Sequence, residues 1–65
     1  MIVADFTINV IDGMFRLIDA NKTGYLSNPF IMYEGDRNTV NQYYGEKILI
    51  GYEAIKKNWI ALYIK

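Results

Sequence analysis

The feature that most constrains the fold is the segment 5–19, DFTINVIDGMFRLID, in which two apolar stretches flank Asp12-Gly13. Asp-Gly is a strong signal for a two-residue type I′ turn, because both of its central residues take positive φ. We therefore predict a β-hairpin, since a helix over 6–18 would contain Gly13 and several β-branched residues. The two strands agree on one core face, which collects Ile8, Val10, Phe15 and Leu17. The opposite face carries Thr7, Asn9 and Arg16.

The chain is short and lacks the side chains that most enzyme sites use. It has 65 residues, with no cysteine and no histidine. We expect a single domain, 1–65, whose core is close to marginal in size. Without cysteine and histidine, disulfides, thiol nucleophiles and the commonest metal ligand and general base are excluded. We therefore expect a non-enzymatic protein with no metal and no cofactor.

Hydropathy and charge bear on location and association. Asp5 and Asn9 interrupt the apolar start, and no apolar run approaches the ~20 residues of a membrane span. We expect a soluble, cytoplasmic protein with no membrane partner. Residues 1–36 hold two basic against five acidic residues, and residues 37–65 hold five against two. The halves either neutralise each other within one fold or favour self-association.

Turn signals divide residues 20–46. Residues 20–24 are typical of a loop, and a strand is predicted over 25–34. Pro29 cannot donate a ladder hydrogen bond, which favours an edge position and makes 30–34 the better half. A turn is expected at 35–38, and residues 39–44 fit either a strand or a single helical turn. Gly45-Glu46 suits a type II′ hairpin turn, which needs glycine first.

The C-terminal residues 47–65 fit either one helix or two strands. A helix would leave Ile50, Ile60 and Ile64 on the face opposite its main apolar stripe. Strands over 47–53 and 59–65 explain more residues by alternation, and we favour them. Lys56-Lys57-Asn58 then forms a three-residue loop with Asn58 in the left-handed region. Trp59 and Tyr63 fall on the face opposite Ile60, Leu62 and Ile64.

The predicted fold is all-β, or β-rich α+β. We expect a small antiparallel meander of about five or six short strands, curled into a barrel or a two-layer sandwich so that its faces are buried. The alternative is an N-terminal β-meander with one C-terminal helix over about 47–63.

Residues 15–27, FRLIDANKTGYLS, resemble the calcium loop of the EF-hand family. The residues at loop positions 1, 3, 5, 6, 7, 8 and 9 would be Asp19, Asn21, Thr23, Gly24, Tyr25, Leu26 and Ser27. The resemblance covers little more than the loop. Position 12, where a bidentate Glu closes the site, is Phe30, preceded by Pro29, and an EF-hand needs a helix on each side. We therefore interpret this segment as a polar turn.

Amphipathic aromatic residues are the compositional feature that points to a function. The chain has six tyrosines and one tryptophan, more than so small a core can bury, and such side chains dominate protein interfaces. The favoured hypothesis is a small binding protein that meets an unidentified protein partner. Its candidate contact residues are Trp59, Tyr63, Tyr43, Tyr44, Lys56 and Lys57. Short chains of this kind are associated with phage or mobile-element inhibitors that act in the host cytoplasm, and with small antitoxins.

Two alternatives stay open. One is a nucleic-acid-binding small β-barrel, which overall neutrality disfavours. It would use the tyrosines together with Arg37, Lys47, Lys56, Lys57 and Lys65. The other is a self-assembling structural module, a homodimer or higher oligomer whose exposed aromatic residues meet their own copies.

Overall fold

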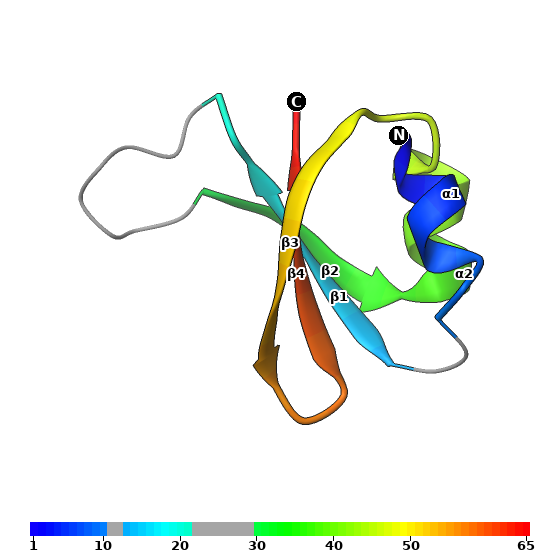
Figure 1. Ribbon diagram of the computed structural model, residues 1–65, viewed down its shortest axis with the longest axis vertical. Coiled ribbons are helices and arrows are strands. Elements are labelled where there is room, and N and C mark those ends of the chain that lie inside the picture. The colour runs from blue at the N-terminus through cyan, green and yellow to red at the C-terminus, as the bar shows by residue number, and fades with distance from the viewer. Residues whose placement is uncertain (11–12, 22–29) are drawn as a thin grey trace.

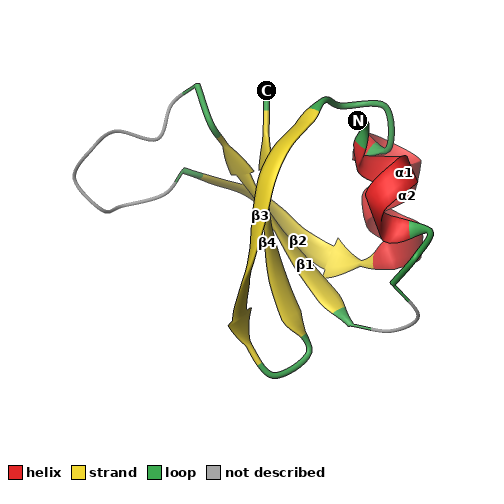
Figure 2. Ribbon diagram, viewed as in Figure 1, coloured by secondary structure: helices red, strands yellow, loops and turns green. Residues whose placement is uncertain are grey.

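The computed structural model describes residues 1–10, 13–21 and 30–65, which form one mixed β-sheet and two short helices (Figure 1, Figure 2). The elements in chain order are α1 (Val3–Thr7), β1 (Met14–Asp19), β2 (Ile31–Asp36), α2 (Arg37–Tyr44), β3 (Leu49–Lys56) and β4 (Trp59–Ile64). The strand order is β2-β1-β4-β3. The central strands β1 and β4 are parallel, and each edge strand is antiparallel to its neighbour. Both helices lie on one face of the sheet, and no other helix or strand of the described residues covers the opposite face, which we call the open face.

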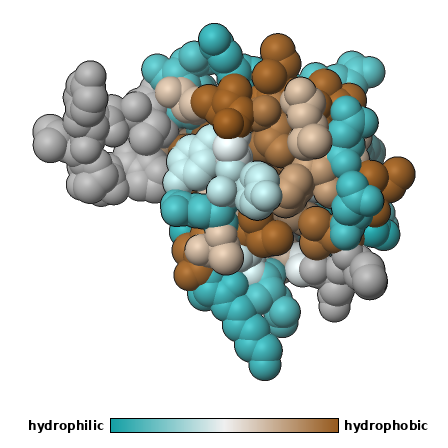
Figure 3. All heavy atoms as spheres, in the orientation of Figure 1, coloured by the Kyte–Doolittle hydropathy of each residue, from teal (hydrophilic) through white to brown (hydrophobic). Residues whose placement is uncertain are grey.

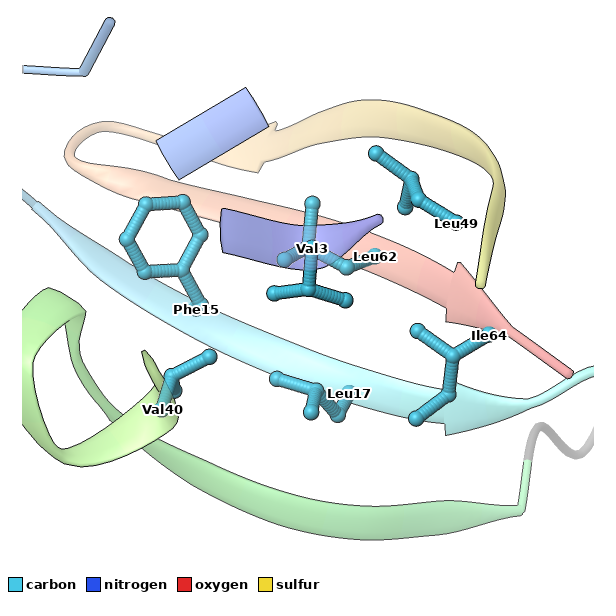
Figure 4. Packing of buried hydrophobic residues seen from close by; sticks show 7 residues of the cluster. All are labelled: Val3, Phe15, Leu17, Val40, Leu49, Leu62 and Ile64. Atoms are coloured by element: carbon cyan, nitrogen blue, oxygen red, sulfur yellow. The ribbon is translucent and has the colours of Figure 1, made fainter. Parts of the chain in front are cut away.

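The core lies between the sheet and the helices. Figure 4 shows Val3 of α1 and Val40 of α2 pointing toward the apolar side chains of the central strands. The buried cluster consists of Val3, Phe15, Leu17, Val40, Leu49, Leu62 and Ile64. The prediction that Phe15 and Leu17 lie in the core is confirmed, since both are 0% exposed.

The predicted hairpin over 5–19 is wrong in its first half. Residues of the expected first strand form α1 and the turn after it, so Ile8 is 73% exposed and Thr7 is fully buried. Val10 is half-buried and packs against the core. The second half is confirmed as β1, which also excludes a helix over 6–18. Gly13 has a φ of 133°, whereas Asp12 of the predicted turn lies outside the described residues.

The cause of this error is non-local. The amides of Val3 and Ala4 donate to the carbonyl oxygens of Lys47 and Gly45, both at 2.9 Å. The chain between α2 and β3 therefore satisfies backbone donors that the start of a helix leaves free. Val3 and Thr7 are four residues apart and so share one helical face, which packs on the core. These contacts outweigh the strand preference of the β-branched residues.

A partly buried hydrogen bond joins the two helices. The hydroxyl of Thr7, which is 0% exposed, donates to Oδ1 of Asn41 on α2 at 2.7 Å. A buried hydroxyl without a partner would be costly, so this bond makes the polar side chain compatible with the core.

The chain from residue 30 onward forms the predicted edge strand but not the type II′ turn predicted at Gly45-Glu46. β2 lies at a sheet edge, as expected from Pro29, and residues 39–44 take the helical alternative within α2. Asp36 starts α2 by accepting a hydrogen bond from the amide of Thr39 at 2.9 Å. The type II′ turn predicted at Gly45 is wrong, because this residue has a φ of −58° and ends α2. A Cβ there would lie 2.5 Å from the carbonyl oxygen of Asn41, which explains the glycine.

The C-terminal residues form the predicted strand pair, so a single helix over 47–63 is wrong. β3 and β4 are antiparallel, and Asn58 has the expected positive φ of 65°. The loop is shorter than predicted, because Lys56 pairs with Trp59 and only residues 57 and 58 form the turn.

The fold is β-rich, as expected, but it differs from a meander of five or six strands. The described residues form four strands in one sheet, and the parallel pairing of β1 with β4 breaks the order of a meander. The sheet does not close into a barrel over the residues that the structure describes. The physical reason is that α1 and α2 cover one face, so closure is not needed to bury it.

The EF-hand resemblance is not supported by the elements around the loop. Strands β1 and β2, rather than helices, flank it, and residues 22–29 lie outside the described part of the chain. Among the residues described, neither helix has the length and apolar character that crossing a membrane requires.

Candidate interaction surface on the open face of the sheet

The open face of the sheet is built from residues that alternate with those of the core. Registered neighbours form rows that run across the strands. The first row contains Met14, Trp59 and Lys56; the second contains Glu34, Arg16, Ala61 and Glu53; the third contains Ile18, Tyr63 and Gly51. Ile18 and Ala61 are each 2% exposed. These two apolar residues lie beneath the larger amphipathic side chains of the same face.

Trp59 lies between two cations on this face. It is half-buried at the start of β4, with Cζ of Arg16 5.6 Å and Nζ of Lys56 5.0 Å from the ring centroid. Each such contact contributes about 0.5–1 kcal/mol at an exposed site. The turn before the ring is also fixed, because the amide of Met14 donates to the carbonyl oxygen of Asn58 at 2.7 Å. These contacts hold the indole in position within the chain itself.

Arg16 is itself oriented by an ion pair. Its Nε lies 2.5 Å from Oε2 of Glu34 on β2, and the two side chains are 26% and 40% exposed. An ion pair this exposed contributes little to stability. Its consequence is geometric, since it keeps the guanidinium beside Trp59.

Tyr63 is tied to β3 by its hydroxyl. The hydroxyl donates to Oε1 of Glu53 at 2.7 Å. The pKa of Tyr63 is raised above its ordinary 10.0, chiefly by this hydrogen bond. Partial burial and the negative charge of Glu53 raise it further. The phenol therefore stays protonated at neutral pH, and its oxygen keeps free lone pairs to accept a hydrogen bond.

The six predicted contact residues divide between two places. Trp59, Tyr63 and Lys56 come together on the open face, and the exposed Lys57 adjoins them in the β3–β4 turn. By contrast, the other two tyrosines lie on α2, on the helix-covered side of the sheet. Their rings pack near that of Tyr33, with centroids 6.1 Å apart for Tyr43 and 5.4 Å for Tyr44.

The basic residues of the nucleic-acid hypothesis do not share one surface. Arg37 is engaged at the start of α2, where Nη1 donates to the carbonyl oxygen of Val10 at 2.9 Å. Lys47 and Lys65 line a small open hollow together with Asp19. The C-terminus, which ends in Lys65, lies at the end of the sheet opposite the β3–β4 turn (Figure 1). Lys56 and Lys57 lie at that turn.

Sequence reasoning missed Arg16, Glu34 and Glu53 as parts of this surface. Arg16 was expected on the polar face of its strand, which is where it lies. Its proximity to Trp59 depends on the parallel pairing of β1 with β4, which joins residues far apart in the chain. No local pattern signals such a pairing.

In residues 1–10, 13–21 and 30–65, no three acidic side chains gather as they would to hold a metal ion. No protein-family model matches the chain, and comparisons with curated proteins and with solved structures found no match.

Proposed function

We propose that this protein is a small, non-enzymatic binding protein that meets a protein partner through the open face of its sheet. The observation that carries the proposal is the pair Trp59 and Tyr63, two half-buried aromatic residues on a central strand. Two cations contact the ring of Trp59, and Glu53 accepts a hydrogen bond from the hydroxyl of Tyr63. Pre-oriented aromatic rings give a large contact area at low entropic cost, and they are the side chains most often responsible for binding energy.

The charges on this face favour a protein over a nucleic acid. Arg16 is paired with Glu34, and Glu53 lies in the same row across the sheet. A phosphate backbone placed on this face would meet two carboxylates as well as the cations. Nucleic-acid grooves, in contrast, combine stacking rings with continuous positive charge. A mixed face of this kind matches a partner that carries both charges, as protein surfaces do.

The proposal is tested by identifying the partner and then truncating the rings. The tagged protein is used to capture its partner from the source cell, and the affinity of the purified pair is measured by calorimetry. Trp59→Ala and Tyr63→Ala should each weaken binding by about 30-fold or more, as expected for residues at the centre of an interface.

Tyr43→Ala is the matched control, because it removes an exposed aromatic ring from the helix-covered side. It should bind as the wild type does. If Tyr43→Ala lost affinity while Trp59→Ala and Tyr63→Ala kept it, the partner would bind α2 and the proposal would be wrong.

A second measurement separates the protein partner from a nucleic acid. Binding of single-stranded DNA and RNA is measured at increasing salt, and a nucleic-acid protein would show tight binding that falls steeply as salt rises. We expect no such binding. Inhibition of a host protein and an antitoxin role are specific forms of the proposed function, and the captured partner distinguishes between them.

A further inference from the structure

The outer edge of β3 offers a second surface, separate from the open face. β3 is the longest strand, with eight residues, and it pairs with β4 on one side only. The N-terminus covers the beginning of the other side, where Ile2 bridges Ile48 and the amide of Leu49 donates to the carbonyl oxygen of Met1 at 2.8 Å. Over residues 50–56, no part of the chain that the structure describes pairs with this edge. A strand edge of this kind is a template for another strand.

Apolar side chains are exposed along the same edge. The exposed fractions of Ile50, Tyr52 and Ile55 are 56%, 62% and 39%. β3 is the strand nearest the viewer in Figure 1. The space-filling view from the same side shows apolar residues among polar ones (Figure 3). Strand addition would remove part of this apolar surface from water, with main-chain hydrogen bonds providing the pairing.

The register of β3 makes the edge complementary to itself. A shift between Ala54 and Lys56 means that these two residues occupy successive positions opposite Ile60 and Trp59. Glu53 and Lys56 thus flank Ala54, and both lie on the open side of the sheet. If an antiparallel copy paired about Ala54, with Ile55 of each chain left out of the new ladder as it is left out of the pairing with β4, Glu53 of each chain would face Lys56 of the other. Opposite charges at directly facing positions stabilise an antiparallel pair.

We propose that β3 pairs with β3 of a second copy of this chain, in antiparallel fashion about a two-fold axis at Ala54. The small side chain of Ala54 fits beside its own copy on the axis. The zero net charge of the chain removes long-range repulsion between the copies. The two sheets become one continuous sheet. Since the axis is perpendicular to it, the two open faces lie on the same side, so the dimer presents Trp59 and Tyr63 twice.

Charge exchange between two positions tests the proposed pairing. Sedimentation equilibrium of the wild type should show a monomer–dimer equilibrium. Glu53→Lys and Lys56→Glu should each raise the dimer dissociation constant by about tenfold, because each places like charges opposite each other twice. The double variant Glu53→Lys/Lys56→Glu should return it to within about threefold of the wild type. Glu46→Lys and Lys47→Glu make the same charge changes outside the paired residues and should leave it unchanged.

A cross-link on the axis provides a measurement that does not depend on affinity. The chain has no cysteine, so Ala54→Cys introduces a single thiol next to its own copy. Facing residues of an antiparallel pair lie about 4.5–5.5 Å apart between Cα atoms, within the range that a disulfide spans. Mild oxidation should link Ala54→Cys rapidly, whereas Glu46→Cys should link only at the slow rate of random encounters.

Either of two results would overturn the proposal. One is a wild type that stays monomeric at the highest concentration while Ala54→Cys links no faster than Glu46→Cys. The other is a dimer whose affinity the double exchange fails to restore, which would place the dimer contact elsewhere. The aromatic face is tested separately by Trp59→Ala, so failure of the dimer leaves the proposed function standing, and the reverse also holds.

Discussion

The helix-covered face and the open face of the sheet are built from adjacent residues of the same strands, yet they are held together differently. On the covered face, apolar side chains from both helices and the central strands interlock with almost no exposure. On the open face, half-buried rings are positioned by an ion pair, two cation–ring contacts and a phenol–carboxylate hydrogen bond. The covered face uses burial, which stabilises the fold; the open face uses contacts that contribute little to stability but fix geometry.

This difference indicates where substitutions are tolerated. A domain of 65 residues buries little apolar surface, so each buried side chain carries a large share of its stability. Apart from the buried Ile18 and Ala61, the side chains of the open face can change without unfolding the chain.

The largest expected effect is a difference in unfolding free energy between substitutions at two neighbouring positions of β1, one on each face of the sheet. Phe15 is 0% exposed in the core, whereas the side chain of Arg16 is 26% exposed on the open face. Phe15→Ala should lower the free energy of unfolding by about 4 kcal/mol, enough to unfold much of the protein. Arg16→Ala should lower it by about 1 kcal/mol or less. Urea denaturation followed by circular dichroism measures both; equal costs would show that the two faces do not differ in this way.

The next effect concerns the polar contact inside the helix layer. Thr7→Val keeps the shape of the side chain but leaves Oδ1 of Asn41 without its donor. The free energy of unfolding should fall by about 1–2 kcal/mol, because the amide oxygen is left without a partner. In an Asn41→Ala background the same change should cost less, and a double-mutant cycle measures this coupling. Additive costs would show that the bond does not form in solution.

The sequence predicts those parts of the fold whose stabilising contacts are local. The alternation in 59–65, the left-handed Asn58 and the edge position of β2 follow from patterns within a few residues. α1 does not, because carbonyl oxygens more than forty residues away cap it. The predicted hairpin over 5–19 is wrong in its first half for the same reason. Its strand pattern placed Phe15 and Leu17 in the core correctly, but a local pattern cannot reveal the contacts made by Val3.

The candidate surface divides in the same way. Alternation along β4 places Trp59 and Tyr63 on the same face, opposite Leu62. The parallel pairing that adds Arg16 cannot be read from either strand alone, and neither can the separation of Tyr43 from Trp59 by the thickness of the sheet. Composition indicates that aromatic residues are available, whereas topology decides which of them meet.

A smaller effect concerns the junction between β2 and α2. The hydroxyl of Thr39 and its amide donate to the carboxylate of Asp36, which lowers the pKa of Asp36 below 3.8. Its stabilising contribution is therefore complete above the unfolded value and is lost as the pH falls through the lower folded value. Asp36→Asn should keep the helix cap and match the wild type at neutral pH.

The pH dependence distinguishes this cap from general acid unfolding. As the pH falls from about 5 to about 2, Asp36→Asn should lose less stability than the wild type, because it lacks the titrating group. Asp36→Ala should be less stable already at neutral pH. Thermal unfolding at several pH values measures all three proteins, and parallel curves for the wild type and Asp36→Asn would contradict the assigned role.

The smallest effect concerns the order of the open face itself. Glu53→Gln removes the charge that the hydroxyl of Tyr63 faces, so the raised pKa of this phenol should fall toward 10.0. Ultraviolet titration of the phenolates measures the shift, with Tyr63→Phe to assign it and Glu46→Gln as a control carboxylate. The raised pKa also means that the contribution of Tyr63 to stability is present below 10.0 and is lost as the pH rises through the folded value. If the wild type and Glu53→Gln titrate alike, the hydrogen bond does not hold Tyr63 in solution. Trp59, which Arg16 and Lys56 contact, would then be the better-held of the two rings on the open face.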